Sequence, residues 1–327
     1  LLPSNVSTSL WASFSTRTLE SHLSSMLSSP LLEVREIAKS MHSEALKLSP
    51  GLLSHVKVND FEVKSRKKLE DYIDQIVEEN ATDEEEIWLY QWIEDKDRVN
   101  LIFEWDLDNS ICASILFYNS KKHWLSFEDC LDMVDEMDNS DKDVLMKLAL
   151  QDRWDFDRFP RAFQHSTVMF EYLVDFWAFR DIQRHRATMQ LWQWATSIHG
   201  YDYPEFIDLP WMENFKEAYD DIMTRATILG QKVVMQTPHL VEYVCALWHL
   251  IRTTFECHPG QIAYVLEQRT TPWGHDSYRR LFIETFKQLK KEAPIFARNI
   301  RVWSLEMQSS RKIQEEKAEI KRKNLWV

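Results

Sequence analysis

Glycine is scarce in this sequence, with five among 327 residues. Loops that cradle a phosphate through backbone N–H groups depend on glycine, and neither a Walker-type nor a dinucleotide-binding glycine fingerprint occurs. Cysteine is scarce as well: the four cysteines stand far apart, at Cys112, Cys130, Cys245 and Cys257. They have neither metal-ligand spacing nor the density of a disulfide-stabilised secreted domain. The sequence therefore predicts no metal site and indicates a reducing compartment.

Long apolar runs and an excess of positive charge are missing too. The most apolar stretch, residues 240–251, is shorter than the ~18 residues that a membrane-spanning helix needs, so no transmembrane segment is expected. The formal net charge is −13, whereas nonspecific nucleic-acid binding depends on a basic surface that displaces counterions. We therefore expect no nucleic-acid partner.

The sequence does contain enough apolar material for a packed core, in one large or two modest domains. Hydrophobic residues make up 44% of the chain and charged residues 28%, as in ordinary globular proteins. The N-terminal residues 1–19 are rich in serine and threonine, include Arg17 and carry no acid before Glu20. That composition is typical of the segment next to a removed organelle presequence and favours the mitochondrial matrix side. A trimmed end of a cytoplasmic protein is the alternative.

The central feature is residues 164–197, where cationic side chains interrupt an apolar pattern. Apolar residues recur there at the spacing of one helix face: Phe170, Leu173, Val174 and Trp177. This spacing predicts a helix with one buried side. Continued in that register, Arg180 would stack on Arg184 one turn later. Asp181 would stack on His185 in the same way.

A helix that turns cationic needs an anion nearby, because unpaired charge away from water is costly. In one interpretation the basic face is solvated and pairs with the acids Asp152, Asp155 and Asp157. In the other it binds a phosphate or an anionic ring, since paired guanidinium groups are planar, bidentate donors. The same three acids are expected to pair with Arg153 and Arg158 rather than to bind a metal ion.

The triplet Arg184-His185-Arg186, with Arg180 before it and His165 nineteen positions ahead of it, resembles the signature region of the flavin-dependent thymidylate synthases, the ThyX family. Arg269 matches a further arginine of that family's flavin and substrate site. The resemblance implies a helix-rich α+β fold in which a small sheet packs against long helices. It also implies that these six residues would hold FAD.

Other positions of the family motif differ in this chain. Trp192 replaces the motif's glutamate, Trp194 its serine and Thr196 its arginine. In the family these polar groups help to hold the nucleotide, so their loss removes donors and acceptors that uracil and phosphate need. Lys232 stands where the family has a substrate-binding arginine; it keeps the charge and loses the bidentate fork. Lys232 is thus a weakened candidate for a substrate phosphate, and no catalytic residue is assigned.

A second recurrence suggests a tandem duplication. Arg35 precedes Pro50 by fifteen positions, and Arg279 precedes Pro294 by the same number, at an offset of 244 residues. Both segments resemble the last helix of a ThyX domain, although two amphipathic helices that end at prolines also look alike by chance. We expect four segments: 1–60, the tail of a truncated first repeat; 61–97, a charged helical connector; 98–304, a degenerate ThyX-like domain; and 305–327, a charged C-terminal extension.

The remaining patterns place other elements coarsely. Helices are expected at 31–48, 67–77, 111–118, 144–150, 211–229, 241–255 and 258–269, with a strand at 99–103. Ser126 with Asp129 predicts a helix start, as do residues 108–110 and Thr82. Gly230 is expected to end the helix before it.

We interpret the chain as a ThyX-like domain that kept its fold and lost its site, used without a cofactor as an accessory subunit of a larger, mitochondrial protein assembly. Trp192 and Trp194 would fill the pocket region with apolar bulk, and charged or tryptophan-rich extensions suit protein partners. One alternative is an active homotetramer with FAD that methylates dUMP using methylenetetrahydrofolate and NADPH. The other is a flavin or nucleotide sensor that binds without turnover.

Overall fold

The computed structural model describes residues 12–80, 98–102, 106–120, 122–154, 157–204, 207, 212–272 and 274–305. They form two compact units. The larger unit contains the described residues of 93–224 and 246–305, and the smaller unit those of 12–80 and 225–245. Within these ranges no helix combines the length and the apolar character that crossing a bilayer requires.

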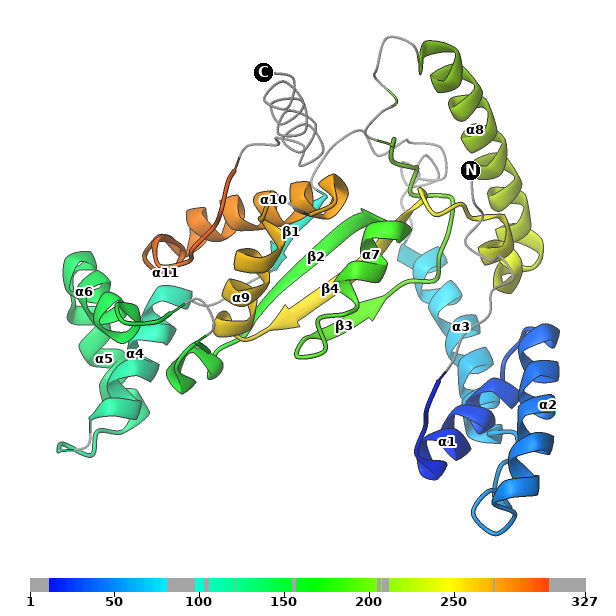
Figure 1. The fold of residues 1–327 in the computed structure, drawn as a ribbon, viewed down its shortest axis with the longest axis horizontal. Coiled ribbons are helices and arrows are strands. Elements are labelled where there is room, and N and C mark those ends of the chain that lie inside the picture. Colours follow the sequence, from blue (N-terminus) through cyan, green and yellow to red (C-terminus); the bar gives the residue numbers. More distant parts are fainter. Residues whose placement is uncertain are drawn as a thin grey trace, which may run out of the picture. The chain divides into compact units, whose positions relative to one another are not determined.

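A four-stranded antiparallel sheet forms the centre of the larger unit (Figure 1). Its strands are β1 (Val99–Ile102), β2 (Val168–Asp175), β3 (Met189–Trp192) and β4 (Leu250–Cys257), in the order β1-β2-β4-β3. The central strands β2 and β4 pair along their whole length. β1 and β3 are therefore the two edges, and the strand expected at 99–103 is confirmed as β1.

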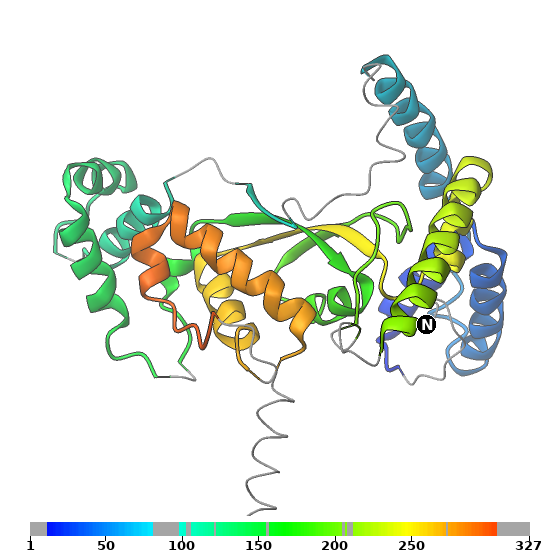
Figure 2. The same ribbon diagram turned by 90° about the horizontal axis from the view of Figure 1, so that it is seen from above.

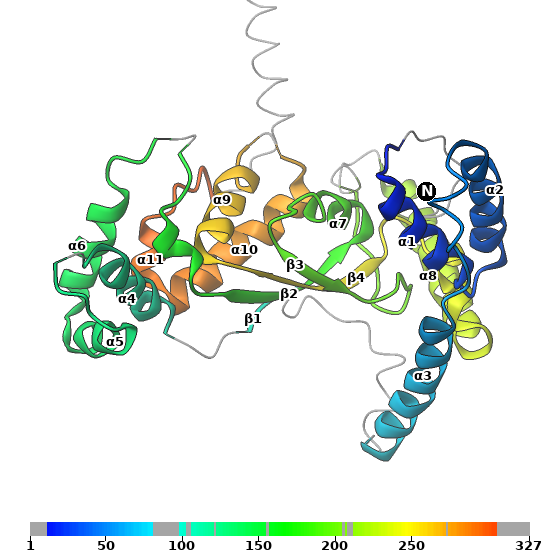
Figure 3. The ribbon, with the colours of Figure 1, turned by 90° about the horizontal axis from the view of Figure 1, so that it is seen from below.

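Three helices cover one face of this sheet (Figures 2 and 3). They are α7 (Phe176–Ile182), α9 (Pro259–Arg269) and α10 (Asp276–Glu292). Alternate side chains of β2, among them Phe170 and Tyr172, point into a buried core to which α10 contributes Phe282. The expected helix-rich α+β fold, with a small sheet packed against long helices, is thus confirmed.

A second group of helices in the same unit follows β1. It consists of α4 (Leu107–Asn119), α5 (Phe127–Glu136), α6 (Asn139–Leu150) and, from the C-terminal side, α11 (Pro294–Arg298). Ser126 and Asp129 form the expected capping box of α5, in which each residue's side chain accepts from the other's backbone N–H. The start predicted at 108–110 is misplaced, because Asp106 caps α4 instead.

Asp108, inside the first turn of α4, links this helix to α11. Its carboxylate is buried and accepts hydrogen bonds from the backbone N–H groups of Ile295 and Phe296, at 2.9 and 2.7 Å. These N–H groups belong to the first turn of α11, where no intrahelical acceptor exists. The side chain of one helix therefore caps another helix far away in the sequence.

The smaller unit consists of helices. It holds α1 (Thr16–Leu27), α2 (Leu32–Leu48), α3 (Asp60–Asn80), the C-terminal part of α8 (Glu213–Gln236) and a 3-10 helix at Pro238–Val244. α1 and α2 enclose a small core around Leu23, Ala38 and Leu53. The helix expected at 31–48 is confirmed as α2, although its apolar residues Leu32 and Leu48 are exposed.

Three predictions about helices are wrong. The segment 170–177 is the end of strand β2 followed by the start of α7. β2 has a strand on each side and buries Leu173 and Val174 on opposite faces, so its nearly continuous apolar run also fits a helical spacing. The segment 241–255 is not one helix either, because it contains the end of the 3-10 helix Pro238–Val244 and most of β4. Gly230 does not end a helix, because α8 continues through it to Gln236.

The acids near residue 155 pair differently from expectation. Arg153 forms its ion pair with Glu267 of α9 rather than with a neighbour in the sequence, and its guanidinium lies over the ring of Phe159. Asp157 accepts a hydrogen bond from the backbone N–H of Trp154. Asp155 lies outside the described residues. Local spacing missed the long-range partner.

The four predicted segments stay a prediction; residues 81–97, with the helix expected after Thr82, and residues 306–327 lie outside the described ranges. The helices that suggested a duplication, α2 and α10, are each 17 residues long. Their arginines have different surroundings, since Arg279 is fully buried whereas Arg35 donates to the carbonyl oxygens of Ser29 and Pro30. The duplication likewise stays a prediction.

Candidate functional site

The arginine-rich motif lies in the connection between α7 and β3. α7 ends at Ile182, and residues 183–188 turn back toward the strand. The side-chain amide of Gln190 in β3 donates to the carbonyl oxygens of Ile182 and His185, at 3.3 and 3.4 Å. These bonds hold the turn against β3, so the motif has a defined conformation on the edge of the sheet.

Arg269, the last residue of α9, reaches this turn. Its Nε donates to Nε2 of His185 at 2.9 Å, and a terminal nitrogen donates to the carbonyl oxygen of Asp181 at 3.2 Å. The guanidinium also lies over the ring of Tyr278, 5.0 Å from its centroid. Because Nε2 accepts a hydrogen bond, the imidazole is neutral with its proton on Nδ1. Burial, and after it the Arg269 cation, lowers the pKa of His185 to about 4.

The other arginines of the motif face solvent. Arg184 forms an ion pair with Asp181 at 2.8 Å while its side chain stays 73% exposed, and Arg180 and Arg186 are also exposed. The predicted stacking along one helix is wrong, because α7 ends before Arg184. An exposed ion pair contributes at most about 1 kcal/mol, so these cations can still meet an anionic partner.

Two predicted site residues lie elsewhere. His165 is exposed between the 3-10 helix Arg161–Gln164 and β2, with its ring 4.7 Å from the ring of Phe127. Lys232 is exposed in the part of α8 that belongs to the smaller unit. Of the predicted residues, the structure thus brings His185 and Arg269 into contact, with Arg184 joined to them through Asp181.

The two tryptophans that replace polar residues of the family motif do not fill a pocket in this chain. Trp192 is 50% exposed and Trp194 58% exposed. The ring of Trp192 packs against Phe179 of α7, with 5.8 Å between centroids. The expectation of buried indoles is wrong because β3 is an edge strand, whose outer side carries no further strand of the described sheet.

Two of the residues that the ThyX resemblance assigns to FAD bond to partners within the chain. That FAD site would use Arg269 and His185 toward the ligand, whereas here the guanidinium donates to the imidazole and to a backbone carbonyl. The exposed guanidinium groups among the predicted flavin-binding residues belong to Arg180, Arg184 and Arg186. Within the described ranges, no three histidine, cysteine, aspartate or glutamate side chains are grouped as a metal site would require.

An acid that the sequence analysis missed lies at the start of α7. Asp175 is fully buried, and its carboxylate accepts from the N–H of Ala178 at 2.8 Å. Burial raises the pKa of this carboxyl to about 6, against the lowering effect of the Ala178 N–H, and the nearby Asp202 carboxylate adds to the rise. An aspartate directly before a helix is a capping signal that the mistaken helix at 170–177 concealed.

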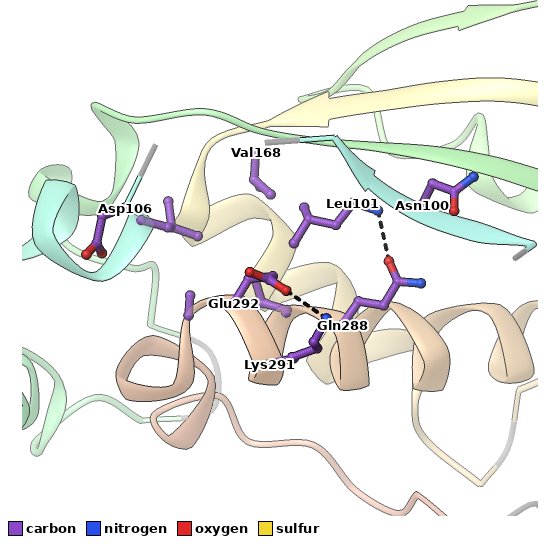
Figure 4. Close-up of a pocket in the computed structure, with 10 residues that line it drawn as sticks. Asn100, Leu101, Asp106, Val168, Gln288, Lys291 and Glu292 are labelled. Atoms are coloured by element: carbon purple, nitrogen blue, oxygen red, sulfur yellow. Dashed lines mark hydrogen bonds and ion pairs between the residues drawn. The ribbon is translucent and has the colours of Figure 1, made fainter. Parts of the chain in front are cut away.

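Two hollows border the edge of β1. The first, of about 670 Å³, lies between β1, the start of α4 and the end of α10 (Figure 4). Gln288 lines it and closes the strand edge: its amide oxygen accepts from the N–H of Leu101 at 2.8 Å, and its amide nitrogen donates to the carbonyl oxygen of Val99. The second, of about 640 Å³, is lined by residues that include Arg98, Tyr201 and Asp202. Among the described residues that line the two hollows, none is a predicted site residue.

Comparison with known proteins gives distant likenesses, and no protein family model matches the chain. A UPF0159 protein of Chlamydia pneumoniae is 25% identical over 274 residues, which are 81% of this chain and 49% of the relative. A UPF0159 protein of Chlamydia muridarum is 26% identical over 308 residues, or 90% and 55% of the two chains. A UPF0159 protein of Thermoplasma acidophilum is 25% identical over 138 residues, or 42% and 27%.

Among solved structures, the chain is similar to the UMP/dUMP methylase PolB from Streptomyces cacaoi. The complexes of PolB with 5-Br dUMP and with 5-Br UMP match at TM-scores of 0.45 and 0.46, with 11% sequence identity in both cases. The matches cover 62% of this chain and 93% and 92% of the PolB chains. The chain spans about half the length of the two chlamydial relatives that it matches.

Proposed function

We propose that this chain is a ThyX-like domain without catalytic activity or bound flavin, and that it serves as an accessory subunit of a larger protein assembly. The observation that carries the proposal is the hydrogen bond from Arg269 to His185. The ThyX resemblance would assign both residues to FAD, yet each is the other's partner within the chain. Donors engaged in internal bonds contribute to stability, and a ligand would have to displace them.

The surface beside this site supports a role in assembly. Trp192, the last residue of the edge strand β3, is 50% exposed, and Trp194, two residues beyond the strand, is 58% exposed. Leu191, next to Trp192, is 74% exposed. Clustered exposed aromatic and aliphatic side chains mark protein interfaces, where tryptophan is a frequent anchor. The mitochondrial matrix side is part of the proposal and rests on the composition of residues 1–19.

The experiment is to purify the chain without added cofactor and record its spectrum and activity. We expect no flavin absorbance at about 450 nm, no dUMP-dependent NADPH oxidation in the presence of methylenetetrahydrofolate, and elution with other subunits when it is isolated from its source. Arg184→Ala should leave the free energy of unfolding within about 1 kcal/mol of the parent, since the side chain is exposed. A yellow protein that turns over dUMP would show that the chain is an enzyme instead.

A second candidate is a flavin or nucleotide sensor that binds without turnover. It is favoured by the three outward cations Arg180, Arg184 and Arg186, which can meet phosphate groups. Titration with FAD, followed by quenching of flavin fluorescence, separates the two candidates. The accessory role predicts no saturable quenching, whereas a sensor predicts saturation that is lost in Arg184→Ala but kept in Arg280→Ala, an exposed arginine of α10.

A further inference from the structure

The outer edge of β3 leaves backbone groups pointing away from the sheet. β3 pairs with β4, with Met189 opposite Glu256 and Leu191 opposite Thr254. Just beyond the strand, the N–H of Gln193 donates to the carbonyl oxygen of Arg252 at 3.0 Å, which identifies the odd-numbered residues as the hydrogen-bonded ones. The even-numbered residues in between therefore direct their N–H and C=O groups to the side away from β4. Such an edge is a template for another strand.

Most side chains along this edge are apolar and exposed, and the two polar ones are Gln190 and Gln193. Met189 is 61% exposed, Leu191 74%, Trp192 50% and Trp194 58%. Exposed edge strands usually carry charged residues or proline, which discourage pairing with other chains. This edge lacks both between residues 189 and 194. It is therefore suited to contact another chain through backbone and side chains together.

Positive charge lies beside the same edge. The ring contact between Phe179 and Trp192 places α7 against β3, and the turn that carries Arg184 and Arg186 leads directly into Met189. Arg180 is next to Phe179 and is also exposed. Arg184 pairs with Asp181 but keeps its side chain 73% exposed, so it can still meet a second anion. An acidic segment of a partner would be attracted to the start of β3.

We propose that β3 is a docking site for an extended segment of a partner protein, which adds a fifth strand to the sheet and carries acidic residues at the end that meets the arginines. The proposal rests on the proposed accessory function and specifies its partner. Residues 189–194 offer about six positions, or roughly 20 Å of strand at about 3.3 Å per residue. Backbone hydrogen bonds would supply affinity, while apolar contacts with the tryptophans and ion pairs with the arginines would supply specificity.

The first test measures binding of a fluorescein-labelled synthetic peptide with five alternating valine and threonine residues and three glutamates at its C-terminus. In an antiparallel arrangement that end meets the start of β3. We expect saturable binding that weakens at least tenfold when salt is raised from 50 to 500 mM. Arg184→Glu combined with Arg186→Glu should weaken binding at least tenfold, whereas Arg280→Glu, on α10, should change it less than twofold. Equal effects of the two sets of variants would overturn the proposal.

The second test examines the backbone. Trp192→Pro removes an N–H that points away from β4, so the existing ladder is kept and only strand addition is blocked. Trp192→Thr loses the same ring and keeps the N–H. We expect at least tenfold weaker binding for the proline variant than for the threonine variant, and slower amide hydrogen exchange at Gln190 and Trp192 when the peptide is bound. Binding that leaves these amides unprotected would refute strand addition.

Two further outcomes separate this proposal from its alternatives. A concentration-dependent dimer that Trp192→Pro abolishes would identify a second copy of this chain as the occupant instead. A chain that lacks flavin and turnover but does not bind the peptide would leave the accessory function standing and remove the docking site. A chain that binds FAD and turns over dUMP would remove the accessory function itself.

Discussion

Replacing Arg269 by methionine tests whether the centre of the motif is structural. Methionine keeps an unbranched apolar stem near the ring of Tyr278 and removes the guanidinium. The change deletes the bonds to His185 and to the carbonyl oxygen of Asp181, at 2.9 and 3.2 Å, and the contact with Tyr278. Hydrogen bonds of charged groups contribute about 1.5–3 kcal/mol each, and a partly exposed cation–π contact adds about 0.5–1 kcal/mol.

Because Arg269 is half-buried, we expect a smaller total than these sums, about 2–4 kcal/mol of lost stability. The assay is urea unfolding followed by circular dichroism, with Arg280→Met as the matched control on an exposed arginine. The control should stay within about 0.5 kcal/mol of the parent. Arg269→Lys should fall between the two, since lysine keeps the charge without the planar fork.

The pH dependence of the same variant gives an independent check. The pKa of His185 is lowered from 6.5 to about 4 in the folded chain, so the unfolded chain binds more protons between these values. The contribution of His185 to the free energy of unfolding is therefore fully present above pH 6.5. It is lost, by at most about 3 kcal/mol, as the pH falls toward 4. Without the Arg269 cation the folded pKa should rise, so this loss should shrink. If Arg269→Met unfolds at the same urea concentration as the parent at every pH, Arg269 does not stabilise the fold. That result would support a role for Arg269 in binding a ligand.

Three other predictions concern stability. Asp175→Asn should raise the free energy of unfolding by about 1–2 kcal/mol at pH 7.5 and by less than about 0.5 kcal/mol at pH 4. The folded pKa of this carboxyl is raised to about 6, so its contribution to stability is lost as pH rises from 3.8 through 6, whereas asparagine is uncharged and still accepts from the N–H of Ala178. Equal effects at the two pH values would contradict this. Asp108→Ala should lower the free energy of unfolding in urea by about 2–4 kcal/mol, since it leaves two buried N–H groups of α11 without their acceptor. A loss below about 1 kcal/mol would show that water replaces the carboxylate. Gly260→Ala should lower the free energy of unfolding by about 1–3 kcal/mol, because the added Cβ would lie 2.8 Å from Cβ of Phe159. The control Gly51→Ala, whose Cβ would have no atom within 4 Å, should leave thermal unfolding nearly unchanged.

Local signals in the sequence predicted local structure. Ser126 with Asp129 located the start of α5, and His258 followed by Pro259 located the start of α9, where the histidine side chain accepts from the N–H of Gln261. Both are patterns of a few adjacent residues whose physical cause lies within one helical turn. The C-terminal half of β2 carried no such signal, because a strand buried on both faces lacks the alternation that would distinguish it from a helix. β4 does alternate buried with half-buried residues from Ile251 to Cys257, but the apolar residues before it favoured a helix over the longer segment.

The candidate site depended on contacts that no local pattern encodes. Arg269 and His185 are 84 positions apart, and the pairing of their side chains follows from how α9 packs against the sheet. The resemblance to ThyX named both residues among six candidates for binding FAD, and that assignment stays a prediction. Likewise the exposure of Trp192 could not be read from its type, since it follows from the position of β3 at the end of the strand order.

The amide of Gln288 gives the two margins of the sheet unequal properties. On β1 it occupies the N–H of Leu101 and the carbonyl oxygen of Val99, so a strand approaching from that side would first have to displace it. Open-ended fibres require every unit to be extendable in both directions. A molecule whose sheet is blocked along one edge can pair with another strand at the other edge only. This favours complexes of fixed stoichiometry over continuous polymers.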